Sequence, residues 1–199
     1  MPTNATSFAV QNISPTVWKF PAEGNVYFVN LARKIVIDTS HRGERQKLEQ
    51  FLSKVIDFNE VTDIIFTHLH LDHCANFDLF PNAKLWASEA EIASFKMDPY
   101  GTVLDRGVVA RLSEKTIHPI EQLGISEFEI LHTPGHTKGS ICILYANEKI
   151  LFSGDTIFPV GIGRTDLPSS VAHKMQDSLN KLSQVQFKIL AAGHDYGLH

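Results

Sequence analysis

The chain contains the stretch Thr67-His68-Leu69-His70-Leu71-Asp72-His73, which places four potential metal ligands within six residues. It follows the apolar, β-branched run at residues 61–66, which favours a buried strand continuing to His68. Because side chains alternate along a strand, His68 and His70 are expected to point the same way from its end. Asp72 and His73 follow where the chain can turn toward a second point. Imidazole and carboxylate groups at this density suit zinc or iron, so the stretch predicts a metal site.

The rest of the chain is predicted to form a layered α/β protein around this site. We expect one domain over residues 1–199, because this length suffices for a substantial core and the composition, 43% hydrophobic and 20% charged, is typical of globular proteins. Further strands are expected at 8–20, 25–30, 34–38, 84–87, 128–131, 140–145, 149–152 and 188–192. Helices are expected at 42–55, at 88–96 and at 169–182. Residues 97–119 are predicted to be the least regular part, with a short helix or a loop at 103–112.

Two of these helices carry sequence signals for their first turn. Ser88 followed by Glu91 predicts a capping box, in which each side chain bonds the other residue's backbone amide. Ser169 or Ser170 is expected to cap the helix at 169–182.

Charge, cysteine content and the chain start give expectations about partners and location. A net charge of −4 gives no basic surface for a nucleic-acid backbone. Cys74 and Cys142 form no CxxC pair and are expected to be reduced and buried. No apolar run approaches the ~18 residues that span a bilayer, and residues 1–7 lack the features of a signal peptide. We therefore expect a cytoplasmic enzyme without nucleic-acid or membrane partners.

An internal similarity divides the chain into two related halves. The strand pair within residues 26–39 resembles the pair within residues 141–156, and each ends on Asp-Thr. Residues 61–68 and 187–194 are both apolar runs that finish on a histidine. Two such sheets packed together, with helices outside, would bring the strand ends of both halves to a shared edge.

Polar residues that follow apolar strands form the candidate metal ligands. They are His68, His70, Asp72, His73, His136, Asp155 and His194. Seven ligands exceed the four of one tetrahedral ion, but they suit two ions that share a carboxylate.

These motifs resemble those of the metallo-β-lactamase superfamily in their usual order. The matching segments are His68-x-His70-x-Asp72-His73, Thr133-Pro-Gly-His136, Ser153-Gly-Asp155-Thr156 and Gly193-His194-Asp195. The resemblance implies a four-layered αββα sandwich with two divalent metal ions between the sheets, zinc first and iron or manganese as alternatives. It implies that His68, His70 and His136 hold one ion and that Asp72, His73 and His194 hold the other, with Asp155 bridging. Asp38 would brace the metal loops. Histidine at position 70, where flavodiiron relatives have glutamate, points away from oxygen reduction.

The branch of the superfamily is indicated by Gly161-Ile-Gly-Arg164-Thr-Asp166-Leu-Pro168 and Gly193-His194-Asp195-Tyr196-Gly197. Both resemble glyoxalase II-like hydrolases and persulfide dioxygenases. Arg164 and Tyr196 are candidate substrate contacts; the alternatives are that Arg164 pairs with Asp166 to fix the loop and that Tyr196 only packs. His132 and the isolated histidines His41, His118, His173 and His199 are expected to be non-ligands, and Cys74 to pack beside the site.

The resemblance implies hydrolysis of a small-molecule thioester or ester by a metal-bridging hydroxide, with Asp72 as the catalytic residue that orients it. Such a hydroxide forms because a binuclear site lowers the pKa of bound water to about 7. Alternatives are a persulfide dioxygenase with a single iron at His68, His136 and Asp155, and a lactonase, since residues 76–83 look similar to lactonase sequences. The chain ends five residues after His194, so we expect glutathione recognition to differ from that of full-length glyoxalase II. A homodimer through residues 97–119 or the C-terminus is compatible with the sequence.

Overall fold

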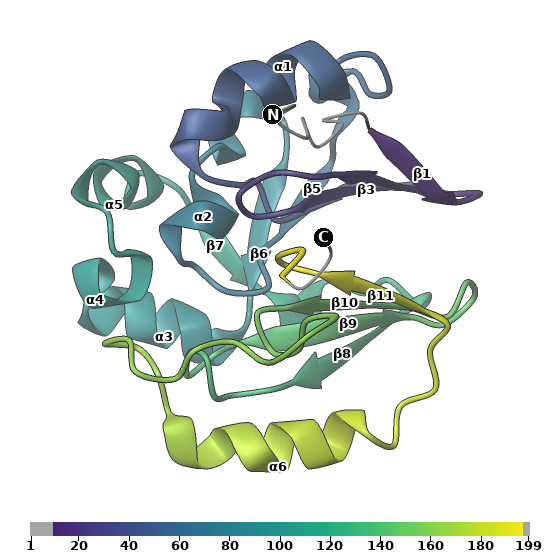
Figure 1. The fold of residues 1–199 in the computed structure, drawn as a ribbon. Coiled ribbons are helices and arrows are strands. Elements are labelled where there is room, and N and C mark those ends of the chain that lie inside the picture. Colours follow the sequence, from purple (N-terminus) through teal and green to yellow (C-terminus); the bar gives the residue numbers. More distant parts are fainter. Residues whose placement is uncertain (1–9, 197–199) are drawn as a thin grey trace, which may run out of the picture.

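Two β-sheets lie face to face in the computed structural model, which describes residues 10–196 (Figure 1). Helices cover the outer face of each sheet, with α1 (Arg45–Leu52) and α6 (Ala172–Leu182) on opposite sides of the pair. The first two residues of the strand region expected at 8–20, the N-terminal segment considered for a signal peptide, and His199 lie outside the described residues.

The first sheet takes its strands in chain order, and within residues 10–196 it has seven of them. Its first four strands pair antiparallel, and the strands from β4 to β7 pair parallel. The strands are β1 (Gln11–Ser14), β2 (Val17–Phe20), β3 (Val26–Asn30), β4 (Lys34–Ile37), β5 (Asp63–Ile65), β6 (Lys84–Ala87) and β7 (Ile117–Pro119).

The second sheet has the order β11-β10-β9-β8. Strands β8, β9 and β10 pair antiparallel, whereas β11 pairs parallel with β10. The strands are β8 (Phe128–His132), β9 (Ile141–Tyr145), β10 (Ile150–Gly154) and β11 (Ile189–Ala192).

Alternation of side chains along the central strands creates the layers. On β3, Tyr27 and Val29 pack between the sheets, and Val26 and Phe28 pack against the outer helices. On the second sheet, Ile141 and Ile143 face the first sheet, while Cys142 packs with Leu182 of α6. Strands β3 and β9 are therefore buried on both faces, which explains their nearly continuous apolar sequences. The protein has the expected αββα architecture.

The two halves repeat one connection. The hairpin β3–β4 leads through α1 to β5, which pairs parallel with β4. The hairpin β9–β10 leads through α6 to β11, which pairs parallel with β10. Asp38 directly follows the second strand of the first hairpin, and Asp155 directly follows that of the second. The similarity between the halves therefore places two carboxylates at equivalent strand ends.

Two predicted elements are shorter than expected. The strand expected to continue to His68 ends at Ile65, because the Thr67 amide donates to Asp38 Oδ1 at 2.8 Å instead of pairing with a neighbouring strand. The helix expected at 42–55 consists of a 3-10 turn, η1 (Arg42–Glu44), followed by α1, which ends at Leu52. The remaining 3-10 turns are η2 (Phe58–Glu60), η3 (Phe77–Leu79) and η4 (Ile120–Gln122).

The segment at 97–119 is more regular than predicted. It holds α4 (Pro99–Val103), α5 (Arg106–Leu112) and β7. Aspartate caps explain these short helices, because Asp98 accepts from the Gly101 amide and Asp105 from the Val108 amide. Both helices continue the outer layer begun by α3 (Glu89–Met97). The sequence left a short helix open at 103–112, where α5 lies, but it did not indicate α4, which spans only five residues.

The cysteines are buried in the core, and the helices are short. Cys74 and Cys142 are both buried and free, as predicted. Across residues 10–196, none of the helices combines the length and apolarity required to cross a bilayer.

Candidate metal centre

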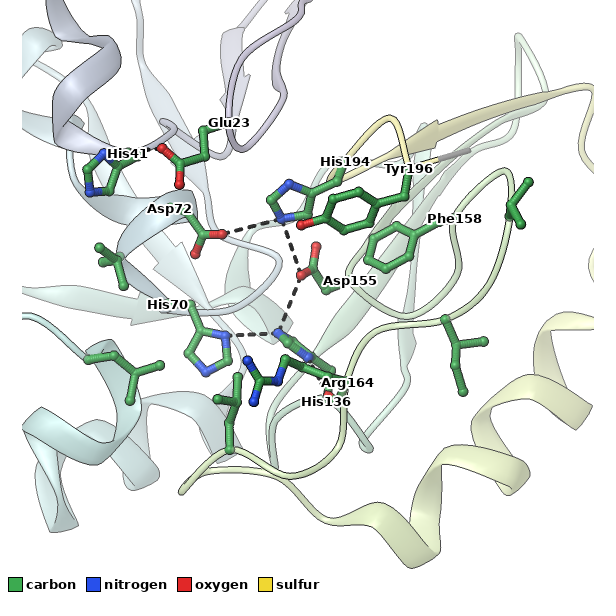
Figure 2. Close-up of a pocket in the computed structure, with 15 residues that line it drawn as sticks. Glu23, His41, His70, Asp72, His136, Asp155, Phe158, Arg164, His194 and Tyr196 are labelled. Atoms are coloured by element: carbon green, nitrogen blue, oxygen red, sulfur yellow. Dashed lines mark hydrogen bonds and ion pairs between the residues drawn. The ribbon is translucent and has the colours of Figure 1, made fainter. Parts of the chain in front are cut away.

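The seven candidate ligands lie together at one end of the two sheets, although they are spread over the chain. Figure 2 labels those that face the cavity, namely His70, Asp72, His136, Asp155 and His194. His68 and His70 lie in the loop after β5, and Asp72 and His73 lie on the short helix α2 (Leu71–Cys74). The second sheet contributes His136, Asp155 and His194 from the segments that follow β8, β10 and β11. Because the two halves face each other, both contribute ligands to one cluster.

Their donor atoms form three groups in which all atoms lie within 4.8 Å of one another. The groups are His68, His70 and His136; Asp72, His73 and His194; and His68, His73 and Asp155. The first two match the two predicted ligand sets. In the third, Asp155 meets one histidine from each set, and its carboxylate also lies 3.5 Å from His136 Nε2 and 3.4 Å from His194 Nε2. This is the position that a bridging carboxylate requires.

Two histidines of the first group, His68 and His136, direct an Nε2 lone pair into the cluster, and His136 Nε2 lies 2.8 Å from His70 Nδ1. His136 Nδ1 donates to the carbonyl of Arg164 at 2.8 Å, so its Nε2 has no proton when the ring is neutral. Thr67 Oγ1 donates its proton to Asp38, so it accepts a hydrogen bond from His68 Nδ1 at 3.2 Å. In the neutral ring, His68 Nε2 is therefore unprotonated and carries a lone pair. That nitrogen is buried and has no hydrogen-bond partner. A buried acceptor without a donor is costly in a protein interior, and a bound cation would satisfy it.

The pKa values of these rings agree with this assignment. Burial, followed by neighbouring histidines, holds the pKa of His68 well below its usual value and lowers that of His70 to about 3. Burial also lowers the pKa of His136. All three rings are therefore neutral at neutral pH, as metal ligation requires.

The second group has the opposite electrostatics. Burial opposes the charged form of His73, but Asp155, Asp38 and Asp72 outweigh it and raise its pKa well above the usual value. Burial opposes the charged form of His194 too, yet its hydrogen bonds to Asp155 and Asp72 raise its pKa to about 9. Burial disfavours the charged carboxylates of Asp72 and Asp155, but the histidine contacts hold their pKa values well below the ordinary range. In the absence of a metal ion, the positive charges of protonated His73 and His194 thus balance the negative charges of Asp72 and Asp155.

Metal uptake at pH 7 is therefore expected to release protons from this second group. His194, with a pKa of about 9 in the metal-free protein, must lose its proton to become a ligand. Affinity should accordingly fall as the pH decreases. Calorimetric titration of metal-depleted protein with zinc, repeated in buffers of different ionisation enthalpy, measures the released protons. Uptake without proton release would contradict this charge balance.

Asp38 braces the first half of the site, as predicted. One carboxylate oxygen accepts from the Thr67 amide at 2.8 Å; the other accepts from Thr67 Oγ1 at 2.7 Å and from His73 Nδ1 at 2.9 Å. These bonds fix the loop between β5 and α2 and direct His73 Nε2 into the cluster. A carboxylate in this place orients a ligating histidine and raises its basicity.

Substituting Asp38→Asn should weaken metal binding about 10–100-fold. The side chain of the introduced asparagine has an NH₂ group where aspartate has an oxygen. This group faces either His73 Nδ1 or the Thr67 backbone amide, so one of these donors loses its acceptor. Competition with a chromogenic chelator measures the affinity. Asp177→Asn on the exposed face of α6 is the matched control and should leave the affinity unchanged. An unchanged affinity in Asp38→Asn would refute the bracing role.

The serines predicted to cap the helix at 169–182 instead support the metal centre. That helix begins at Ala172 after Val171, which provides no side-chain cap. Ser169 Oγ lies 3.2 Å from His70 Nε2, and Ser170 Oγ donates to the backbone carbonyl of His136 at 2.7 Å. The capping prediction was wrong because the same short polar side chains also suit bonds to a neighbouring loop.

Glu91 completes only half of the predicted capping box. Ser88 accepts from the Glu91 amide at 3.1 Å, so the serine does cap α3. The Glu91 carboxylate, however, is fully buried and accepts from the Leu69 amide at 2.9 Å, Thr137 Oγ1 at 2.8 Å and the Gly139 amide at 3.0 Å. Leu69 lies between two candidate ligands, and Thr137 follows a third. Glu91 therefore joins the metal loops of the two halves, a role that its position in sequence did not reveal.

The candidate substrate contacts lie at the mouth of the site (Figure 2). Arg164 and Asp166 form the predicted pair within their loop, with two hydrogen bonds of 2.8 and 2.9 Å. Tyr196 stacks on His194, with ring centroids 4.8 Å apart, and is 55% exposed. Sequence reasoning missed the apolar wall beside it, formed by Phe158 and its neighbours, because single exposed apolar residues in a loop carry no motif.

The other described histidines lie outside the ligand cluster, and of these His41 lines the mouth of the cavity. His132 Nε2 lies 3.4 Å from Glu121, and His41 caps η1 by accepting from the Gly43 amide. His118 packs beside Trp86, with ring centroids 5.1 Å apart. His173 lies on the exposed side of α6. Cys74 is buried, and its thiol donates to the Leu69 carbonyl, so it packs beside the metal loop as expected.

Comparison with known proteins identifies the family. Residues 21–194 match the model of the metallo-beta-lactamase superfamily, and the chain belongs to this superfamily. A protein from Methanocaldococcus jannaschii, named as a probable metallo-hydrolase, is 32% identical over 168 residues, which cover 81% of this chain and 80% of that protein. A hydroxyacylglutathione hydrolase from Francisella tularensis subsp. novicida is 34% identical over 140 residues, covering 68% of this chain. The match spans only 50% of that enzyme's length.

Solved structures show the same fold. A metallo-beta-lactamase family protein from Thermus thermophilus superposes with a TM-score of 0.69 at 21% identity, covering 92% of this chain and 74% of that one. A protein designated TTHA1623, solved in a di-iron-bound form, superposes with a TM-score of 0.67 at 22% identity, covering 93% of this chain and 91% of that one.

Proposed function

We propose that the protein is a metal-dependent hydrolase of thioesters or esters. The observation that carries this proposal is the cluster of neutral histidines whose lone pairs, including the unpartnered His68 Nε2, converge beside a second group rich in carboxylates. The superfamily membership and the relatives named as metallo-hydrolase and hydroxyacylglutathione hydrolase support it.

We assign His68, His70 and His136 to one divalent ion and Asp72, His73 and His194 to the other, with Asp155 between them. The three groups of donor atoms support this assignment. Zinc is our first expectation because imidazole and carboxylate ligands suit it, and the relative solved with two irons keeps iron as an alternative. Two such ions would supply Lewis acidity and a water acidic enough to act as a nucleophile near neutral pH.

The chain's own residues prepare the substrate site around this centre. Asp72 is partly exposed at the cavity and lies 3.3 Å from His194 Nε2, so one carboxylate can orient a water molecule and contact a ligand. His136 is held by the Arg164 carbonyl, and this bond positions the 161–168 loop over the centre. Tyr196, at the rim, is placed to contact substrate with its hydroxyl or its ring.

The test is an activity panel on protein whose metal content has been measured. Metal-loaded protein is expected to hydrolyse thioesters or simple esters and to consume no oxygen with glutathione persulfide. Rapid oxygen uptake by protein holding one iron would overturn the hydrolase proposal in favour of a persulfide dioxygenase. Hydrolysis restricted to cyclic esters would favour a lactonase.

A further inference from the structure

The cavity that opens from the metal centre to solvent has a largely apolar outer wall. Its volume is about 460 Å³, and five of the candidate ligands line it: His70, Asp72, His136, Asp155 and His194. The apolar residues that line it are Leu71, Leu104, Phe158, Val160, Ile162 and Leu167. Val160 is 64% exposed and Ile162 is 47% exposed, and Tyr196 adds a third exposed side chain at the same rim. Exposed apolar side chains gathered on one concave surface indicate a binding site.

The chain holds this wall in place before any ligand arrives. The Phe158 amide donates to the Gly161 carbonyl at 3.0 Å, and Ile157 pairs with Ile162, so residues 157–162 form a tight turn. Gly161 has φ +94°, a conformation that favours glycine. The Phe158 ring meets Tyr196 edge to face at 5.0 Å, and both lie beside His194 (Figure 2). An apolar group bound here would therefore lie next to the reacting centre.

The cavity offers little to bind an anionic group away from the metal ligands. Of the described residues that line it, Arg164 and His41 are the basic ones outside the ligand cluster. Arg164 is engaged by both oxygens of Asp166, and His41 Nδ1 lies 3.4 Å from Glu23. Carboxylate recognition usually needs an arginine fork or an ammonium group that is available to the ligand. Here the basic groups already have acidic partners.

Building on the hydrolytic function proposed above, we propose that the substrate is a thioester or ester with an uncharged, apolar acyl chain and an uncharged leaving group. The acyl chain lies against Phe158, Val160 and Ile162. Among the described rim residues, an anionic carrier such as glutathione would meet basic groups that are already paired with carboxylates, and it would be a poorer substrate.

Two matched thioester series test this specificity. In the first, acetyl, butanoyl, hexanoyl and octanoyl groups are carried by N-acetylcysteamine, a neutral thiol; in the second, glutathione carries the same groups. The expected kcat/KM rises about two- to four-fold for each added methylene that the wall buries. The neutral series should exceed the glutathione series by at least about tenfold, a difference of the size that one charged hydrogen-bonding partner contributes.

Two variants test whether the apolar wall sets the preference for chain length and whether the pairing of Arg164 sets the preference for a neutral carrier. Ile162→Ser should reduce the ratio of octanoyl to acetyl kcat/KM, whereas Met97→Ser, an equally simple change at a residue that is 81% exposed outside this cavity, should not. Asp166→Ala removes the carboxylate that pairs with Arg164, so it should raise kcat/KM for the glutathione thioesters relative to that for the neutral thioesters. A higher kcat/KM for glutathione thioesters, or no dependence on chain length, with hydrolysis intact, would overturn the specificity alone. Failure of metal-loaded protein to hydrolyse any member would overturn the hydrolase proposal and this inference with it.

Discussion

Replacing Asp72 with alanine is expected to lower thioester turnover by about 10²–10⁴-fold, the range that a positioned acid–base group typically contributes. Asp72 is the candidate ligand whose side chain remains most open to the cavity, with 26% exposure, and its carboxylate lies 3.3 Å from His194 and 3.9 Å from His73. The substitution removes both a contact to the second metal group and the carboxylate that can orient water. Steady-state kinetics with metal supplied in excess measures the loss.

The fold should tolerate this change, because the Asp72 side chain is partly exposed and the buried bonds that hold the metal loops are made by Asp38 and Glu91. Circular dichroism of Asp72→Ala should therefore match that of the parent. Asp177→Ala, which removes an exposed carboxylate from α6, is the matched control and should retain full turnover. Unchanged turnover in Asp72→Ala would refute the assigned role.

Replacing Glu91 with glutamine should impair both stability and metal binding, although the Glu91 carboxylate bonds the metal loops rather than the ligand side chains. Its two oxygens accept three hydrogen bonds in a fully buried place. The amide of glutamine turns a donor toward either the Leu69 amide or the Gly139 amide, and a buried donor left without an acceptor costs about 1–3 kcal/mol. Thermal unfolding of the metal-free variant measures this cost.

The second effect of Glu91→Gln concerns the three-histidine group. Glu91 links the residue between His68 and His70 to the residue after His136, so loosening it should misplace these three ligands relative to one another. We expect metal affinity at this group to fall about 10–100-fold, as it does when groups that orient ligands are lost. Glu89→Gln, on the exposed side of the same first turn, is the control. A destabilised variant with unaltered metal affinity would show that Glu91 serves the fold only.

The fold was predictable because the sequence repeats a simple physical pattern. Strands such as β3 and β9 are apolar on both faces, and such strands are expected between two layers. The candidate ligands were also predictable, since histidine and aspartate directly after apolar strands collect at one sheet edge. The Asp38 and Asp155 positions follow from the repeat itself.

The supporting residues were harder to predict because their partners are distant in sequence. Ser88 and Glu91 satisfy a local capping rule, yet the carboxylate bonds Leu69 and Gly139, 22 and 48 positions away. Ser169 lies 99 positions from His70. A local pattern predicts local bonds, and only the packing of the two halves decides which long-range bonds replace them. The apolar wall of the cavity likewise depends on the turn at residues 157–162 and its position beside the metal centre.

The measurement that tests the central claim most directly is thioester turnover as a function of zinc added to metal-depleted protein. We expect no turnover without metal, a rise on addition of zinc, and a plateau at about two equivalents, the number that a binuclear centre holds. Parallel metal analysis of the desalted protein should give the same stoichiometry. Full turnover by protein that contains no metal would contradict the account.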